Sequence, residues 1–255
     1  MRILVIGDVI GRPGRRAVSR LLPELNEQYG IDLVVANAEN TAGGIGVTPE
    51  TAQEMLEGGV HVLTSGNHIW AWKEIIPCLE SNMPLLRPLN YPPGVPGRGY
   101  LITGSVMVVN LIGRVFMSSF DCPFRAMDHL LDELRGRPPV IIIDFHAEAT
   151  SEKVALGRYL DGRVSAVLGT HTHVGTIDSQ ILPRGTAYVT DIGMTGPLDS
   201  VIGDDVDLVT KRFLTMIPHR LSVGKGKVQL NAVLVTVDEV SGRALAIERI
   251  SREVS

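Results

Sequence analysis

The sequence predicts an α/β protein, because short apolar strands alternate with amphipathic helices over its first 170 residues. Such alternation builds a largely parallel sheet with helices packed on its faces. A second observation concerns the C-terminal part, where strand patterns at residues 228–237 and 244–250 flank a turn at 238–242. This hairpin predicts a second, more antiparallel sheet. No linker separates two halves of the chain, so we expect a single domain over residues 1–255.

The strands are predicted from apolar runs that are rich in β-branched residues and bounded by glycine, proline or polar residues. The run at residues 164–168 is a good example, since it is short, apolar and followed by Gly169. A continuous apolar run indicates a strand that is buried on both faces. In chain order, the predicted strands cover residues 2–6, 31–36, 60–64, 100–103, 106–111, 140–145, 164–168, 187–190, 228–237 and 244–250.

The helices are predicted from apolar residues at helical spacing and from capping signals. Such residues recur between Ala17 and Leu25, although Pro23 would kink this helix or mark its boundary. Thr48-Pro49-Glu50 combines an N-cap, a first-turn proline and an acidic first turn. The predicted helices cover residues 15–28, 48–58, 70–80, 125–134, 152–160 and 205–216, and the proline-rich residues 83–99 are predicted as a loop.

Composition excludes several classes of protein. The chain has 44% hydrophobic and 20% charged residues, which is ordinary for a globular protein. A net charge of −4 argues against a duplex nucleic-acid binder, so we expect no stable nucleic-acid complex. Cys78 and Cys122 form no CxxC motif and suggest a reducing compartment. The apolar start at residues 3–6 is too short for a signal peptide or a membrane span. We therefore expect a cytoplasmic protein without membrane association.

The strongest local signal for chemistry is the stretch Gly169-Thr170-His171-Thr172-His173, which follows a predicted strand. Two histidines at positions i and i+2 project to the same side of extended backbone. Neutral imidazole is the commonest nitrogen ligand of first-row metals, so the pair indicates half of a metal site. Taken alone, the stretch is also compatible with two polar residues in a turn.

Potential ligands follow five predicted strands, and ligands of open α/β sheets bind beyond the carboxyl ends of the strands. Each residue alone has an ordinary explanation, such as a helix cap for Asp8 or a left-handed turn for Asn67. Their coincidence at one topological edge indicates a single site. The candidate residues are Asp8, Glu39, Asn40, Asn67, His68, His146, His171 and His173.

Seven of these residues carry more donors than one tetrahedral metal needs, namely three imidazoles, two carboxylates and two amide oxygens. They suit two metals roughly 3.5–4 Å apart that share one carboxylate. Nitrogen and oxygen donors without thiolate favour iron, manganese or zinc. Such a pair clamps phosphate oxygens and lowers the pKa of a shared water for in-line attack at phosphorus. His68 follows a predicted ligand directly and is therefore the candidate acid that protonates the leaving alkoxide.

These motifs resemble those of the calcineurin-like metallophosphoesterases, in the same order along the chain. The counterparts here are Gly7-Asp8, Glu39-Asn40, Gly66-Asn67-His68, His146 and Gly169-Thr170-His171-Thr172-His173. The sequence departs from that superfamily at two positions. Its usual Asp-x-His is Asp8-Val9-Ile10, and its usual Gly-Asp is Glu39-Asn40 after Ala38. The resemblance then implies that Glu39 is the bridging carboxylate and that Asn40 replaces the lost histidine.

With these departures, residues 2–250 resemble the bacterial YmdB-like phosphodiesterases. The resemblance implies a four-layer α/β/β/α sandwich, a binuclear iron or manganese site and a homo-oligomer. It also implies hydrolysis of 2′,3′-cyclic nucleotides, with 3′,5′-cyclic nucleotides as a further substrate class. In this scheme, His68 is the proton donor. Metal one would be held by Asp8, Glu39, Asn40 and His173, and metal two by Glu39, Asn67, His146 and His171.

Three alternative functions are considered from the sequence. The first is a phosphomonoesterase or nuclease that uses the same site. The second is a regulatory protein that binds metal and nucleotide without turnover, and the third is an RNA-binding protein. An RNA-binding role lacks a basic stripe interleaved with aromatic residues. The basic cluster between Arg12 and Arg20 either steers an anionic substrate or forms an exposed face or oligomer contact. Trp70 and Trp72 either stack on a base or belong to the packing.

Overall fold

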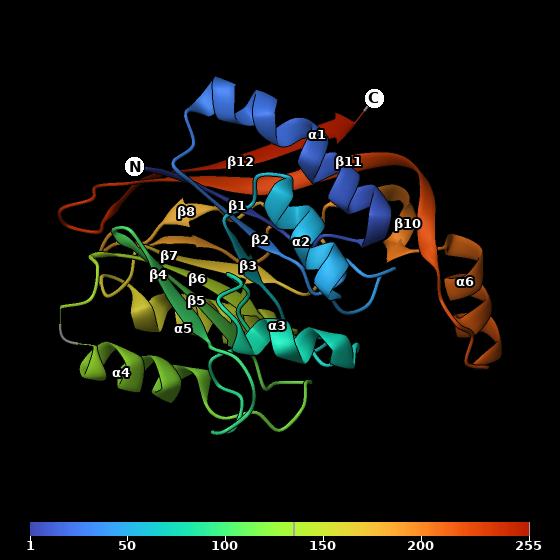
Figure 1. Ribbon diagram of the computed structural model, residues 1–255, viewed down its shortest axis with the longest axis horizontal. Coiled ribbons are helices and arrows are strands. Elements are labelled where there is room, and N and C mark those ends of the chain that lie inside the picture. Colours follow the sequence, from blue (N-terminus) through green and yellow to red (C-terminus); the bar gives the residue numbers. More distant parts are fainter. Residues whose placement is uncertain (135, 255) are drawn as a thin grey trace.

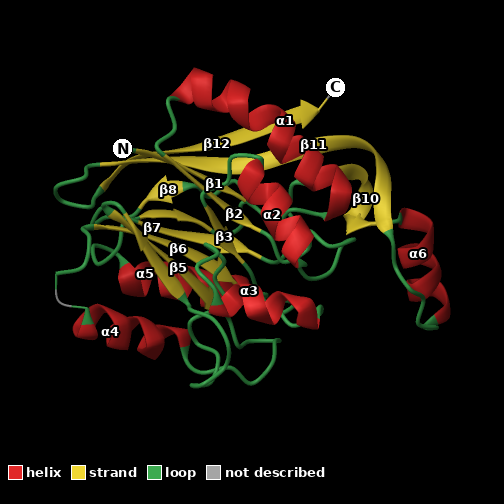
Figure 2. Ribbon diagram, viewed as in Figure 1, coloured by secondary structure: helices red, strands yellow, loops and turns green. Residues whose placement is uncertain are grey.

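The computed structural model describes residues 1–134 and 136–254. Within these residues, two six-stranded sheets pack face to face, and helices cover the outer face of each sheet (Figures 1 and 2). One hydrophobic core fills the space between the sheets, and two further cores lie between the sheets and their helices. The predicted α/β class and the four-layer α/β/β/α sandwich are thereby confirmed.

The first sheet has the strand order β10-β11-β1-β2-β3, and β12 pairs with β11. Strands β1, β2 and β3 are parallel to one another, whereas β11 is antiparallel to β1, β10 and β12. The prediction that the late hairpin forms a second sheet is therefore wrong. Its first strand pairs with the N-terminal strand, a long-range contact that local sequence patterns do not reveal. The strands are β1 (Arg2–Ile6), β2 (Leu33–Asn37), β3 (Val62–Thr64), β10 (Gly196–Asp204), β11 (Val223–Val237) and β12 (Ala244–Val254).

The second sheet has the strand order β4-β5-β6-β7-β9-β8. Its four central strands are parallel, and the edge strands β4 and β8 are antiparallel to their neighbours. Both sheets therefore bring parallel strand ends to one side of the sandwich. The strands are β4 (Tyr100–Thr103), β5 (Val106–Ile112), β6 (Val140–His146), β7 (Ala166–Thr170), β8 (Gln180–Ile181) and β9 (Ala187–Val189).

The helices cover the outer faces of the sandwich, except for α6, which extends beyond the β10 edge of the first sheet (Figure 1). Helices α1 and α2 pack on the first sheet, and α4 and α5 pack on the second. The short η1 and α3 follow β3. The helices are α1 (Gly11–Tyr29), α2 (Pro49–Glu57), η1 (Lys73–Ile75), α3 (Ile76–Glu80), α4 (Pro123–Glu133), α5 (Thr150–Leu160) and α6 (Val206–Thr215).

The strands are apolar on both faces because each sheet lies between two cores. Alternate residues of β1 point to opposite sides. Ile3 and Val5 pack between the sheets, whereas Leu4 and Ile6 pack against the helices of the first sheet. The continuous apolar runs that predict the strands follow from this double burial. The same packing holds the strand ends in a fixed relation to one another.

Several predicted element boundaries are wrong. Helix α1 begins at Gly11, before the predicted start at residue 15, and the exposed Pro23 lies inside the helix and does not end it. The predicted helix over residues 70–80 begins only at Lys73. The strand predicted at residues 164–168 runs from Ala166 to Thr170. Strands β8 and β10 are additional elements that the sequence patterns do not predict. Within residues 1–134 and 136–254, no helix is both long and apolar enough to cross a membrane.

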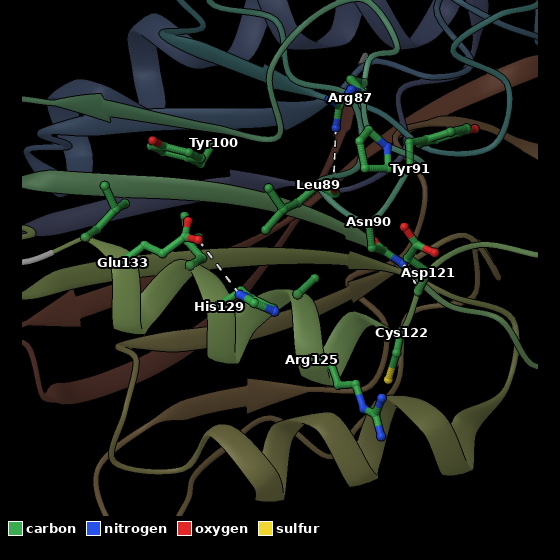
Figure 3. A pocket seen from close by; sticks show the side chains of 14 residues that line it. Arg87, Leu89, Asn90, Tyr91, Tyr100, Asp121, Cys122, Arg125, His129 and Glu133 are labelled. Carbon is green, nitrogen blue, oxygen red and sulfur yellow. Dashed lines mark hydrogen bonds and ion pairs between the residues drawn. The ribbon is translucent and has the colours of Figure 1, made fainter.

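A cavity of about 560 Å³ lies between helix α4 and the segment that leads from Arg87 into β4 (Figure 3). Leu89 and Tyr100 line one side, and His129 of α4 lines the other. The Nδ1 atom of His129 lies 3.8 Å from a carboxylate oxygen of Glu133, one helical turn further along. None of the residues predicted as metal ligands or proton donor lines this cavity.

Candidate metal centre

The predicted site residues lie at the carboxyl ends of five parallel strands, as expected, but the strands belong to two sheets and not to one. Asp8, Glu39 with Asn40, and Asn67 with His68 follow β1, β2 and β3 of the first sheet. His146 ends β6, and His171 with His173 follows β7, both in the second sheet. Because the sheets pack face to face, the two sets of residues meet across the sandwich.

Three of the predicted ligands converge on the Nε2 atom of a fourth, His146. This atom lies 3.1 Å from Glu39 Oε1, 3.1 Å from Asn67 Oδ1 and 3.0 Å from His171 Nδ1. One imidazole nitrogen carries at most one hydrogen, so it cannot satisfy three acceptors at once. Donor atoms of Glu39, His146 and His171 all lie within 4.8 Å of one another. This arrangement fits a cation that several lone pairs share.

Asp8 and Asn40 form the neighbouring part of the site. Asp8 Oδ1 lies 3.7 Å from His173 Nε2, and Asp8 Oδ2 accepts a hydrogen bond of 3.2 Å from the His171 peptide N–H. The amide nitrogen of Asn40 donates to the Gly44 carbonyl, at 2.9 Å. Within the part of the chain that the structure describes, the buried Oδ1 atoms of Asp8 and Asn40 have no hydrogen-bond partner. Buried oxygens rarely lack a partner, and a cation would provide one for both.

A buried network orients His146. Its Nδ1 atom lies 3.0 Å from the Thr170 hydroxyl, which in turn donates to Asp144 Oδ1 at 2.7 Å. Asp144 also accepts hydrogen bonds from Thr64 and Asn37. Since the Thr170 hydrogen is directed at the carboxylate, Thr170 accepts the Nδ1 hydrogen of His146. In neutral His146, the Nε2 atom is then free of hydrogen and faces the other ligands, as a metal-binding histidine requires.

The charges of the site explain its perturbed pKa values. Burial disfavours a charged His146, but Glu39 and Asp8 outweigh this effect and raise the pKa of His146 to about 9. Burial also opposes ionisation of Glu39, yet His146 holds the pKa of Glu39 well below its usual range. Burial and the neighbouring His146 lower the pKa of His171 to about 3. The buried carboxylates thus require a positive charge, which His146 supplies when no other cation is bound.

The loop that carries His171 and His173 is not extended, so the predicted i and i+2 geometry is wrong. Both residues have a positive φ, of 92° and 65°. His171 directs Nδ1 at His146, and its Nε2 lies 3.1 Å from Glu148 Oε2. His173 instead approaches Asp8, and its Nδ1 lies 2.7 Å from the Ile202 carbonyl oxygen. The two imidazoles therefore serve different parts of the site.

His68 stands between the buried carboxylate and an open cavity. Its Nδ1 lies 3.4 Å from Glu39 Oε1 and 3.5 Å from the Asn40 amide nitrogen. The side chain is 34% exposed, and it lines a cavity of about 740 Å³ together with Glu39, Asn40, His171 and His173. The position predicted for a proton donor is therefore accessible from the cavity.

The opposite wall of this cavity was not predicted from the sequence. It includes Gly203 and Asp204 of β10, Arg212 of α6 and Arg220. No motif marks these residues, because the return of β10 and α6 to the site is a long-range contact. Trp72 also lines the cavity, and its indole N–H donates to the Ile45 carbonyl.

The other aromatic and basic candidates lie apart from the cavity. Trp70 packs against the core and meets Tyr91 edge to face, which is a packing role. Arg15 pairs with Glu54 at 2.6 Å. Three further arginines line a separate cavity of about 640 Å³ beside α1 and β11, and these are Arg12, Arg16 and Arg20.

Gly66, which follows β3, allows Glu39 after β2 and His146 of β6 to approach each other. A Cβ atom at this position would lie 2.2 Å from Glu39 Oε2 and 2.2 Å from His146 Cδ2. We therefore expect Gly66→Ala to displace both side chains and to lower the metal affinity of the protein at least tenfold. Equilibrium dialysis of the metal-free protein against Mn²⁺ measures this affinity. Gly58→Ala is the control, since its added Cβ meets nothing closer than 3.2 Å. Unchanged affinity in Gly66→Ala would contradict this packing argument.

Comparisons with known proteins show which family the chain belongs to. The family model described as YmdB-like protein matches residues 4–250. The chain is 47% identical over 254 residues to a 2′,3′-cyclic-nucleotide 2′-phosphodiesterase of Bacillus subtilis strain 168, covering 98% of this chain and 96% of that protein. A hypothetical protein from Thermus thermophilus, known from its crystal structure, has a TM-score of 0.93 at 47% identity, covering 99% of each chain.

A second crystal structure is that of a novel phosphatase from Mycoplasma pneumoniae. It also has a TM-score of 0.93, at 33% sequence identity, and the match covers 99% of this chain and 93% of that one. The motifs, the four-layer sandwich and these matches over nearly the whole chain lead to one conclusion. The protein belongs to the YmdB-like family.

Proposed function

We propose that this protein is a metal-dependent phosphodiesterase that hydrolyses 2′,3′-cyclic nucleotides, with 3′,5′-cyclic nucleotides as a further substrate class. The observation that carries the proposal is the convergence of Glu39, Asn67 and His171 on His146 Nε2 beside an open cavity. The name of the Bacillus subtilis relative supports the substrate class. The cavity of about 740 Å³ is large enough for a small-molecule substrate.

The donor set suits two cations of iron, manganese or zinc, because it offers imidazole nitrogens and oxygens but no thiolate. When bound, such cations neutralise charge on the phosphate and lower the pKa of a water molecule. Glu39 belongs to both ligand sets, which agrees with its central position between His146 and His68. The first set is Asp8, Glu39, Asn40 and His173, and the second is Glu39, Asn67, His146 and His171.

The protein side chains account for the remaining chemistry. Water attacks phosphorus, and the bond between phosphorus and a ribose oxygen breaks. The ribose oxygen leaves with a proton that His68 donates, since His68 faces the cavity from beside Glu39. The product of a 2′,3′-cyclic substrate is then a nucleoside monophosphate in which one of the 2′ and 3′ oxygens has become a free hydroxyl.

A homo-oligomer is also part of this proposal. Helix α6 and the residue after it expose apolar side chains to solvent, with Phe213 at 73%, Leu214 at 80% and Met216 at 82%. Neighbouring apolar side chains with this exposure are typical of a protein–protein contact. A second copy of the chain is the partner that the family resemblance implies.

Metal content is the decisive first measurement. We expect about two equivalents of iron, manganese or zinc per chain in gently purified, untagged protein, together with hydrolysis of 2′,3′-cyclic AMP. One equivalent would contradict the binuclear site. The cause would then be Ile10, which stands where the wider superfamily carries a histidine ligand. No metal after reconstitution with excess metal would overturn the catalytic proposal in favour of a binding protein. Faster hydrolysis of 3′-AMP than of the cyclic diester would instead indicate a phosphomonoesterase.

A further inference from the structure

A fully buried ion pair lies beside the site, and the proposed chemistry does not use it. Lys153 of α5 is 1% exposed, and its Nζ lies 2.9 Å from Oδ2 of Asp191, which is 0% exposed. The aliphatic part of Lys153 packs beside Gly169, where a Cβ atom would overlap the Thr190 carbonyl and lie 3.2 Å from Lys153 Cδ. Buried lysines are rare, and a buried ion pair is often no more stabilising than apolar side chains of similar size. Global stability therefore does not explain this pair.

Both members of the pair contact Thr172, the residue between the two histidines. Asp191 Oδ2 accepts hydrogen bonds from the Thr172 hydroxyl at 2.6 Å and from the Thr172 peptide N–H at 3.2 Å. The Nζ of Lys153 lies 3.2 Å from the same hydroxyl oxygen. Asp191 is itself held in place, since its Oδ1 accepts the Gly193 peptide N–H at 2.8 Å. Thr172 is thus fixed by its backbone and by its side chain.

The backbone on either side of Thr172 needs such support. His171 and His173 both adopt a positive φ, a conformation that residues other than glycine rarely adopt. This conformation sends His171 towards His146 and His173 towards Asp8. A strained backbone persists only where its surroundings hold it.

We propose that Lys153 and Asp191 are positioning residues, which act through Thr172 to hold His171 and His173 in the arrangement that binds metal. Neither residue touches the substrate in this scheme. The inference rests on the proposed metal-binding role of the two histidines. It adds that a buried ion pair between α5 and the segment after β9 sets the metal affinity of the centre.

The test is metal affinity, measured by equilibrium dialysis of metal-free protein against Mn²⁺. We expect Thr172→Val to lower the affinity about 10- to 100-fold, because it removes the hydroxyl but keeps the shape. Thr172→Ser keeps the hydroxyl and is expected to stay within about threefold of the wild type. Arg163→Met is the matched control. It removes an ion pair in which a guanidinium nitrogen of Arg163 lies 2.7 Å from Asp128 Oδ1, and this pair does not contact Thr172.

A second variant tests the pair itself. The double substitution Lys153→Met with Asp191→Asn removes both charges together, so that no unpaired charge stays buried. We expect it to fold, as judged by circular dichroism, and to lose Mn²⁺ affinity like Thr172→Val. Nuclear magnetic resonance of the histidine side chains in the metal-free protein should show shifted His171 and His173 signals in both variants. The double variant also decides the question if Thr172→Val does not fold.

The outcomes separate this inference from the proposed function. Wild-type protein that binds no Mn²⁺ would overturn both proposals. Wild-type protein that binds Mn²⁺, together with unchanged affinity in a folded Thr172→Val or double variant, would overturn only the positioning role. Equal losses in Thr172→Ser and Thr172→Val would also count against it, because the hydroxyl would then be irrelevant.

Discussion

Replacing Glu39 by Gln is expected to lower kcat/KM for 2′,3′-cyclic nucleotides by roughly 10³-fold or more and to reduce the bound metal below two equivalents per chain. The reason is that Glu39 is the predicted ligand shared by both sets. Its carboxylate is 1% exposed and approaches both His146 and His68. A neutral amide keeps the size of the side chain but removes the negative charge that two cations would share.

Elemental analysis and steady-state kinetics on the same preparation measure this effect. Glu133→Gln is the control, because Glu133 is an exposed carboxylate that also approaches a histidine, His129, but lies on α4 outside the metal cavity. We expect this control to keep two equivalents of metal. A Glu39→Gln variant that retains two equivalents and activity within tenfold of the wild type would rule out the bridging role. A cellular signalling role that survives in Glu39→Gln without hydrolysis would favour the regulatory binding protein.

Replacing His68 by Ala is expected to lower kcat for 2′,3′-cyclic AMP by about 10²- to 10⁴-fold, the usual range for a general acid. An ester with a good leaving group needs no protonation. Hydrolysis of bis(4-nitrophenyl) phosphate should therefore fall less than about tenfold. Metal content should stay at the wild-type value, since His68 belongs to neither proposed ligand set.

The ratio of the two losses measures the acid role. His129→Ala is the matched control, because this histidine lies on the surface of α4, with a side chain that is 81% exposed, outside the metal cavity. It is expected to change neither rate. Equal losses for both substrates in His68→Ala would show that His68 positions the substrate or a ligand and does not protonate the leaving group.

The sequence alone was enough to identify the alternating strands and the residues at their carboxyl ends. Both signals are local: a strand buried on two faces is apolar throughout, and the polar residue that follows it stands out. The family resemblance rests on the same short motifs, such as Gly66-Asn67-His68. These motifs could be recognised without the fold, because metal chemistry restricts the residue types at each position.

Long-range pairing was beyond the sequence. The C-terminal hairpin was predicted to form its own sheet, but β11 pairs with β1 and extends the first sheet. The strands that precede the predicted ligands were expected in one sheet, but β6 and β7 belong to the second sheet. The cavity wall at Arg212 and Arg220 was missed for the same reason, since β10 and α6 approach the site only in the folded chain.

The orientation of the site residues was decided by tertiary structure. The sequence identified His171 and His173 as a pair, but extended backbone would have directed both to one point. The folded chain gives both a positive φ and directs them to different partners, His146 and Asp8. Lys153 and Asp191 are distant from each other in sequence, and both contact Thr172, the residue between the two histidines. The residue types determine which donor atoms are present. The direction of each side chain depends on packing between segments that are distant in sequence.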